Sequence, residues 1–148
     1  MNVRTISNTI FSAGTIGNVT TSKNLIGSWL LAGYDIGTDY AMSTSGDATF
    51  GAGKGNIGAI TVGGTMSSSS IAAGIAPGAG LHFGDDDDSV LVSSSLEGAI
   101  KSLTVTGLSG PTNVVVSHKA LGALKVGTTA YKTPWPAIAN LVIKDNIV

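Results

Sequence analysis

Four consecutive aspartates, Asp85 to Asp88, form the densest group of chemically functional side chains in this sequence. Adjacent carboxylates repel one another unless water solvates them or a cation neutralises them. Oxygen ligands on a flexible loop suit Ca²⁺, which binds roughly six to eight of them. The alternative is a solvated acidic turn, because four adjacent aspartates lack the alternating ligand spacing of an EF-hand. The candidate ligands of a calcium site are therefore Asp85, Asp86, Asp87 and Asp88, with Ser89, Asp35 or Asp39 completing the shell.

No arrangement of residues for nucleophilic or acid–base catalysis is recognisable. The two histidines, His82 and His118, are 36 residues apart, and no Gly-x-Ser-x-Gly nucleophile turn occurs. The glycine-rich stretch Gly51 to Gly55 lacks the Gly-Lys-Ser/Thr ending of a phosphate-binding loop. The alternating segments carry almost no charged residues, so a cleft for cleaving acidic polysaccharides is not expected either. We therefore expect no enzymatic activity.

The composition narrows the class of protein further. The chain has 148 residues with 8 basic and 9 acidic side chains, so nothing attracts it electrostatically to nucleic acid or anionic lipid. It is 43% apolar and only 11% charged, with 21 glycines and no cysteine, which suits neither a disordered segment nor a helical bundle. The longest apolar patch, Trp29 to Ala32, is far too short to span a membrane. These features predict one all-β domain over residues 1–148, dense in turns.

Internal repeats give the strongest signal for the fold. The motif Ile-Gly-Ala-Ile-Thr-Val-Gly at Ile57 has a near copy at Leu121 and weaker copies at Ile16 and Ile100. A second motif begins 14 residues after each of the first three copies, at Leu30, Ile71 and Val114, and a half-copy stands at Ile10. Period-2 alternation within the first motif is typical of a half-buried strand.

The spacing of the copies predicts a parallel β-solenoid of about four coils. The 21 residues between Ile100 and Leu121 are about one circuit, in which each strand pairs in parallel with its counterpart one coil along. The longer spacings after Ile16 and Ile57 are explained by two long loop insertions on one face, over residues 34–54 and 75–97. Loops this long stay ordered only if they bury something, so we expect Phe50 and Phe83 to anchor them against each other.

These motifs resemble the repeats of large secreted bacterial surface and adhesin-like proteins, which are built as right-handed parallel β-helices. The resemblance rests on Ile-Gly-x-Ile-Thr-Val-x-Gly, on Ser-x-Ile-x-Ala-Gly, and on a Pro-Gly-Ala-Gly stretch that leads into Phe-Gly-Asp-Asp-Asp (Pro77 to Asp87). It covers about residues 10–127. It implies a structural role outside the cell or at the cell surface, and an all-β, right-handed β-helix fold. No signal peptide is visible in the sequence.

The two ends of the chain predict self-assembly. Both terminal segments alternate like strands, and no capping helix is apparent, so the terminal coils would expose unpaired strand edges. We therefore expect a structural subunit that stacks head to tail with itself into a filament or a surface or matrix layer. The alternative is a calcium-dependent module of a large adhesin that binds surface glycans. The candidate residues of the assembly interface are Ile6, Ile10, Phe11, Ile138, Leu141 and Ile143.

Overall fold

The protein is all-β. The computed structural model describes residues 1–39, 47–50, 54–91 and 97–148, so parts of both predicted insertions lie outside the described residues. No helix occurs among the residues described. In chain order the strands are β1 (Asn2–Val3), β2 (Ile6–Ser7), β3 (Ile10–Ala13), β4 (Val19–Thr21), β5 (Leu25–Ile26), β6 (Trp29–Ala32), β7 (Tyr34–Asp35), β8 (Ala48–Thr49), β9 (Ile57–Ser67), β10 (Ser70–Ala73), β11 (Ile75–Ala76), β12 (Ser89–Val90), β13 (Ile100–Ser109), β14 (Asn113–Ser117), β15 (Leu124–Val126), β16 (Thr129–Tyr131) and β17 (Leu141–Lys144).

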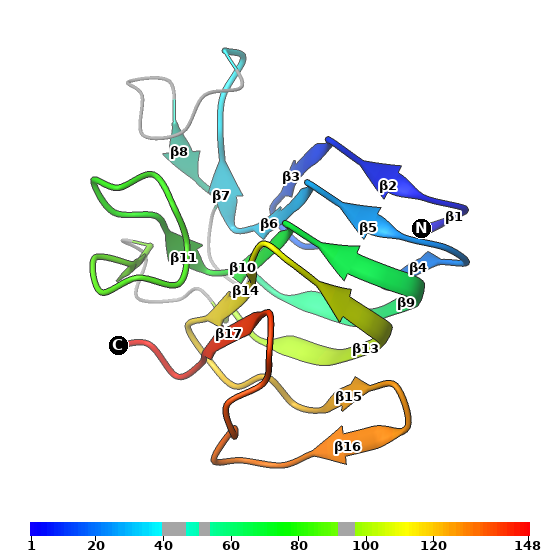
Figure 1. Ribbon diagram of the computed structural model, residues 1–148. Helices are drawn as coiled ribbons and strands as arrows, with labels where there is room; N and C mark the ends of the chain where they lie inside the picture. Colours follow the sequence, from blue (N-terminus) through cyan, green and yellow to red (C-terminus); the bar gives the residue numbers. More distant parts are fainter. Residues whose placement is uncertain (40–46, 51–53, 92–96) are drawn as a thin grey trace.

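Two largely parallel sheets form the body of the molecule (Figure 1). The chain visits them alternately, and we call one pass through both sheets a rung. Sheet A runs in the order β1, β4, β9, β13, β15 and β16, with β2 and β5 alongside; sheet B runs in the order β3, β6, β10, β14 and β17. The five rungs are therefore β1–β3, β4–β6, β9–β10, β13–β14 and β15–β17, one more than the four copies of the first motif.

The predicted alignment of the first motif is confirmed. Ile57 is the register partner of both Ile16 and Ile100, and Ile100 is the partner of Leu121. All four side chains are at most 3% exposed and belong to the apolar core between the sheets. The first motif is thus one row of interior side chains that passes through four successive rungs.

The predicted alignment of the second motif is wrong by one residue in β14. Leu30 pairs with Ile71, but Ile71 pairs with Val115 and not with Val114. The register of β13 against β9 shifts between Val105 and Gly107, where β13 has one residue fewer than the matching part of β9. Between the last register pair of β13 with β9 and the first of β14 with β10, the chain through β13 and β14 then has two residues more than the chain through β9 and β10. The net shift of one residue places Val115 inside the core, whereas Val114 faces outward.

Sheet A bends along β9 and β13, which each span the positions of two short strands. The first half of β9 pairs with β4 and its second half with β5. Gly63 and Gly64 lie between these two halves, and an added Cβ would lie 2.8 Å from the Ser22 carbonyl oxygen at Gly63 and 2.9 Å from that of Lys23 at Gly64. Only glycine allows the backbones to approach this closely.

A buried polar column crosses the rungs at the turn before sheet B. The Thr9 amide donates to Ser28 Oγ, the Ser28 amide donates to Ser69 Oγ, each at 3.2 Å, and the Ser69 amide donates to Asn113 Oδ1 at 3.1 Å. Ser28, Ser69 and Asn113 are at most 1% exposed. Because buried amides must be paired, this column fixes the register between rungs as firmly as the apolar rows do.

The two insertions leave sheet B at equivalent positions and share a second apolar cluster, as predicted. They follow Gly33 and Gly74, which both have positive φ, and each begins with a short antiparallel pair, β7–β8 or β11–β12. The prediction for Phe83 is confirmed, because it is 6% exposed in this cluster. Phe50 is half-buried and lies instead beside Gly14. The full membership is Leu31, Tyr34, Ile36, Ala72, Ile75, Phe83, Leu91 and Val116.

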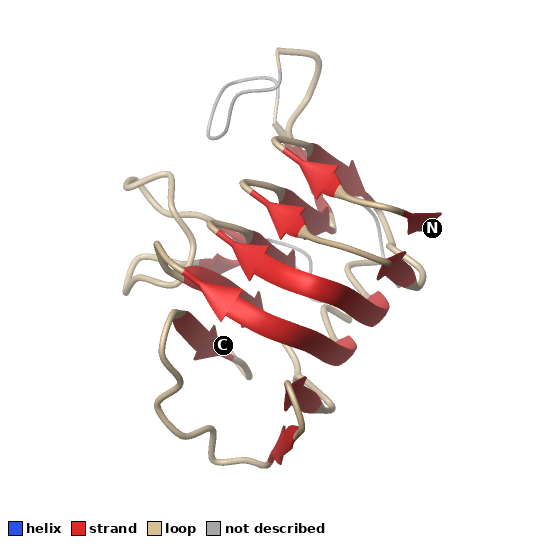
Figure 2. Ribbon diagram, turned by 45° about the vertical axis from the view of Figure 1, so that its right-hand side comes forward, coloured by secondary structure: helices blue, strands red, loops and turns tan. Residues whose placement is uncertain are grey.

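The chain itself partly covers the apolar interior at the C-terminal end, which the sequence did not predict, although β16 and β17 each pair on one side only among the strands described. β16 turns back antiparallel to β15, and the segment that follows crosses toward β17 (Figure 2). Tyr131, Trp135 and Ile138 are half-buried against the core along this path. Residues 128–148 carry no copy of the repeat, and for that reason the repeat pattern could not predict the cover.

Candidate functional site

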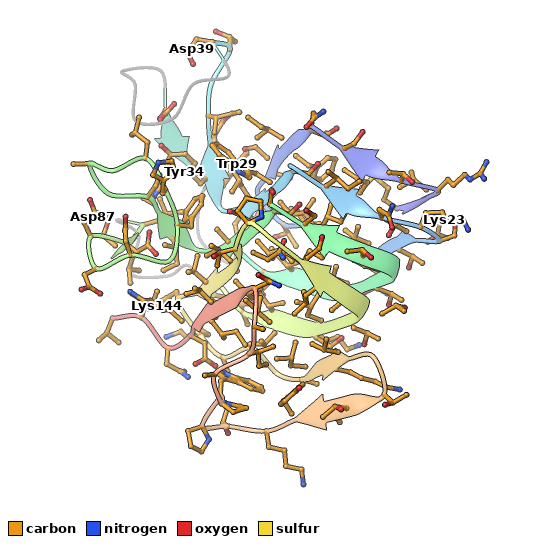
Figure 3. All side chains as sticks on the ribbon, in the orientation of Figure 1. Lys23, Trp29, Tyr34, Asp39, Asp87 and Lys144 are labelled. Atoms are coloured by element: carbon orange, nitrogen blue, oxygen red, sulfur yellow. The ribbon has the colours of Figure 1, made fainter. Side chains whose placement is uncertain are left out.

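Three of the four consecutive aspartates converge in the second insertion. Carboxylate oxygens of Asp85, Asp87 and Asp88 all lie within 4.8 Å of one another. Asp86 is directed elsewhere, because its Oδ1 pairs with Lys144 Nζ at 3.0 Å. The same ammonium group donates to the Asp85 carbonyl oxygen at 2.7 Å, so β17 holds this loop from below (Figure 3).

The carboxylates of the acidic cluster, Asp85, Asp87 and Asp88, differ in their proton affinity. A hydrogen bond with Asp87 raises the pKa of Asp85, and the same bond, together with the Gly80 amide, lowers the pKa of Asp87. Burial raises the pKa of Asp88. Asp88 Oδ2 accepts a hydrogen bond of 2.6 Å from the Gly84 amide, but its Oδ1 is buried and has no hydrogen-bond partner. A divalent cation bound by oxygen ligands would relieve both the repulsion and the unpaired oxygen.

The other proposed ligands and the histidines lie apart from this acidic cluster. Asp35 Oδ1 accepts a hydrogen bond of 3.0 Å from the Gly37 amide, and Asp39 lies at the far tip of the first insertion (Figure 3). His82 is exposed, whereas His118 Nδ1 is 2.8 Å from the Ile147 carbonyl oxygen and supports the C-terminal segment. Within the described residues, only Asp85, Asp87 and Asp88 form a group able to hold a metal ion.

The N-terminal rung leaves both sheets with open edges. Among the strands described, β1, β2 and β3 each pair on one side only. Phe11 is the register partner of Leu30 in the interior row, yet it is 38% exposed because no rung covers it. Ile10 is exposed to the same extent, and Met1 and Val3 add further apolar surface.

The six predicted interface residues therefore divide into three groups. Ile10 and Phe11 are exposed, Ile138 and Ile143 are half-buried against the core, and Ile6 and Leu141 are each 7% exposed within the core of their own chain. Met1 was not among the predicted residues, whereas Val3 begins the terminal segment, through Phe11, whose strand-like alternation predicted pairing with the next copy. Lys144 was not predicted as a partner of Asp86, because it lies 58 residues away along the chain.

In comparisons with known proteins, no protein-family model, no curated protein and no solved structure matches this chain. The described residues contain no helix long and apolar enough to cross a membrane. The resemblance to β-helix repeats thus remains a prediction from the sequence motifs.

Proposed function

We propose that the chain is a right-handed parallel β-solenoid. Three observations support this fold. The five rungs pair in parallel, one interior row of apolar side chains runs through successive rungs, and a buried polar column links neighbouring rungs. With about 4.8 Å between neighbouring strands, five rungs give a body roughly 20 to 25 Å long.

We further propose that it is a structural subunit that stacks end to end through its N-terminal rung. The observation that carries this function is the exposure of Phe11 in an interior row beside two unpaired sheet edges. Unpaired strand edges and exposed apolar patches both promote association. An extracellular or cell-surface filament or layer is the setting that the sequence motifs favour.

Sheet B offers the continuation. Its last strand, β17, pairs in parallel with β14 on one side. The other side of β17 pairs with no described strand, so β3 of the next copy can pair there. Sheet A ends in the antiparallel strand β16, so the joint would be made mainly by sheet B. Joining different surfaces of two copies is heterologous and does not close, so it produces a filament.

The experiment for this proposal is sedimentation velocity over a range of protein concentrations. A structural subunit that stacks end to end gives species that grow with concentration and exceed a dimer. A single monomeric species at every concentration contradicts the proposal.

A second candidate function is a calcium-dependent module. It is favoured by the buried, unpartnered Oδ1 of Asp88 beside the carboxylates of Asp85 and Asp87. Isothermal titration with calcium chloride tests it directly, because a chain without this function releases or takes up no heat beyond dilution.

A further inference from the structure

A cavity of about 490 Å³ opens on the outer face of sheet B. It exists because Ser70 on β10 stands in register between Trp29 on β6 and Val114 on β14. The small serine leaves a gap between two large neighbours, each about 4.8 Å away along the sheet. Phe83 and His82 of the second insertion and Thr112 of the turn before β14 close the remaining sides.

The polar side chains of this cavity have no hydrogen-bond partner among the described residues. In the part of the chain that the structure describes, the hydroxyls of Ser68, Ser70 and Thr112 take part in no hydrogen bond, and neither do the ring nitrogens of Trp29 and His82. Buried polar groups of folded proteins are normally paired, and exposed ones bond to water or to a ligand. This cavity thus offers several free donors and acceptors around aromatic surface.

The lining also restricts the charge of an occupant. No aspartate, glutamate, lysine or arginine contributes to the cavity. Its volume is within the range of roughly 300–1,000 Å³ that is usual for small-molecule sites, which combine apolar walls with a few polar groups. This lining favours an uncharged occupant that has an apolar face for Trp29 and Phe83 and hydrogen-bonding groups for the three hydroxyls.

We propose that this cavity binds a neutral saccharide. A sugar ring has an apolar C–H face that can lie on the indole ring of Trp29. Sugar hydroxyls both donate and accept hydrogen bonds, and so do the serine and threonine hydroxyls of the cavity. The site is separate from the end-to-end contact, because its residues lie on the side of sheet B and not at its edges. It also shares no residue with the acidic cluster, although His82 and Phe83 belong to the same insertion.

The two tryptophans make a direct test possible. Trp29 lines this cavity and Trp135 lies at the C-terminal cover, so a ¹⁵N spectrum has two indole N–H signals, which a Trp135→Phe variant assigns. We titrate the parent chain with cellohexaose, maltohexaose and chitohexaose to millimolar concentrations. The proposal predicts a saturable shift of the Trp29 signal with at least one of them, while the Trp135 signal stays in place.

A pair of matched threonine variants tests the hydroxyl contact. Thr112→Val removes one free hydroxyl of the cavity and should weaken saccharide binding about fivefold. Thr129→Val removes the hydroxyl of another exposed threonine, on β16 and outside the cavity, and should leave the affinity unchanged. The proposal is overturned if none of the three oligosaccharides shifts the Trp29 signal, if both indole signals shift alike, or if Thr112→Val binds as tightly as Thr129→Val.

Discussion

Phe11 and Leu30 are register partners on neighbouring strands, and they differ in burial because only one of them has a rung on both sides. Leu30 is fully buried, whereas Phe11 is 38% exposed at the open N-terminal end. Full burial of a phenylalanine is worth about 1.5 to 3 kcal/mol. The partial exposure of Phe11 therefore leaves apolar surface whose burial by a second chain would be favourable.

Replacement of Phe11 by lysine should abolish assembly. The charged side chain would have to be desolvated at the joint, which costs far more than the joint gains there. Sedimentation velocity should show the variant as a monomer at concentrations at which the parent forms multimers.

Ile26→Lys is the matched control for that variant. Ile26 is also 38% exposed, but its strand β5 is paired on both sides, so it lies on the side of the molecule. Ile26→Lys should assemble like the parent. Equal loss of assembly in both variants would mean that general surface apolarity, and not the N-terminal rung, drives association.

Calcium should raise the melting temperature through the acidic cluster. Binding to the folded state alone stabilises it by mass action, by about 2.7 kcal/mol at a hundredfold excess over the dissociation constant. Asp87→Asn should remove this effect. Asp86→Asn should retain it, because Asp86 pairs with Lys144 and lies outside the cluster. Identical melting curves of the parent with calcium and with a chelator would leave the acidic segment as a solvated turn.

The half-buried carboxyl of Asp88 should make the stability of the folded state fall as pH rises. Burial raises its pKa in the folded state above 3.8, so over the window between these two values the folded state binds more protons than the unfolded state. Its contribution to stability is therefore lost as pH rises through the folded-state pKa. In the absence of calcium, Asp88→Asn should melt higher than the parent at pH 7, and the difference should vanish in acid. A variant that melts lower at neutral pH would contradict this assignment.

The buried polar column should contribute more to the free energy of unfolding than an exposed hydrogen bond does. Asn113 is fully buried, and Asn113→Ala removes the acceptor of the Ser69 amide and the donor to the Met66, Ser109 and Asn140 carbonyl oxygens. We expect a loss of about 3 kcal/mol in the free energy of unfolding, measured by urea denaturation. Asn18→Ala removes one exposed bond to the Ala59 amide and should cost at most about 1 kcal/mol. Similar costs for both would show that the column does not fix the register.

The sequence predicted those features that its repeats encode. Ile57 and its copies are apolar because they fill interior positions of stacked strands. The same motif surrounds each of them, so their alignment could be predicted from the sequence. Val114 was misplaced because a local shift in β13 and a longer turn nearly cancel, and neither alters the apolar pattern. Sequence spacing cannot show such compensating changes.

The candidate sites were only partly readable for a similar reason. Four adjacent aspartates indicated a possible cation site, but the separation of Asp86 from the others depends on Lys144, which arrives from β17 at the other end of the chain. The cavity beside Trp29 depends on Ser70 lying in register between two large residues. Both features come from pairing between distant strands, so they became visible only once the register was known.

Disulfide trapping tests the end-to-end contact most directly. The chain has no cysteine, so any disulfide that forms must join the introduced cysteines. On the outer face of sheet B, one row of register partners runs from Ser12 on β3 to Lys144 on β17. The residues between them in this row are Leu31, Ala72 and Val116. In a head-to-tail joint Ser12 and Lys144 become neighbours about 4.8 Å apart, which a disulfide can bridge.

After mild oxidation, the double variant Ser12→Cys, Lys144→Cys should give a ladder of covalent multimers on a non-reducing gel, whereas each single variant stays monomeric. Covalent dimers from Ser12→Cys alone would show that two N-terminal rungs meet, which contradicts head-to-tail stacking. A double variant that remains monomeric, at concentrations at which the parent sediments as multimers, would equally contradict a joint between β3 and β17.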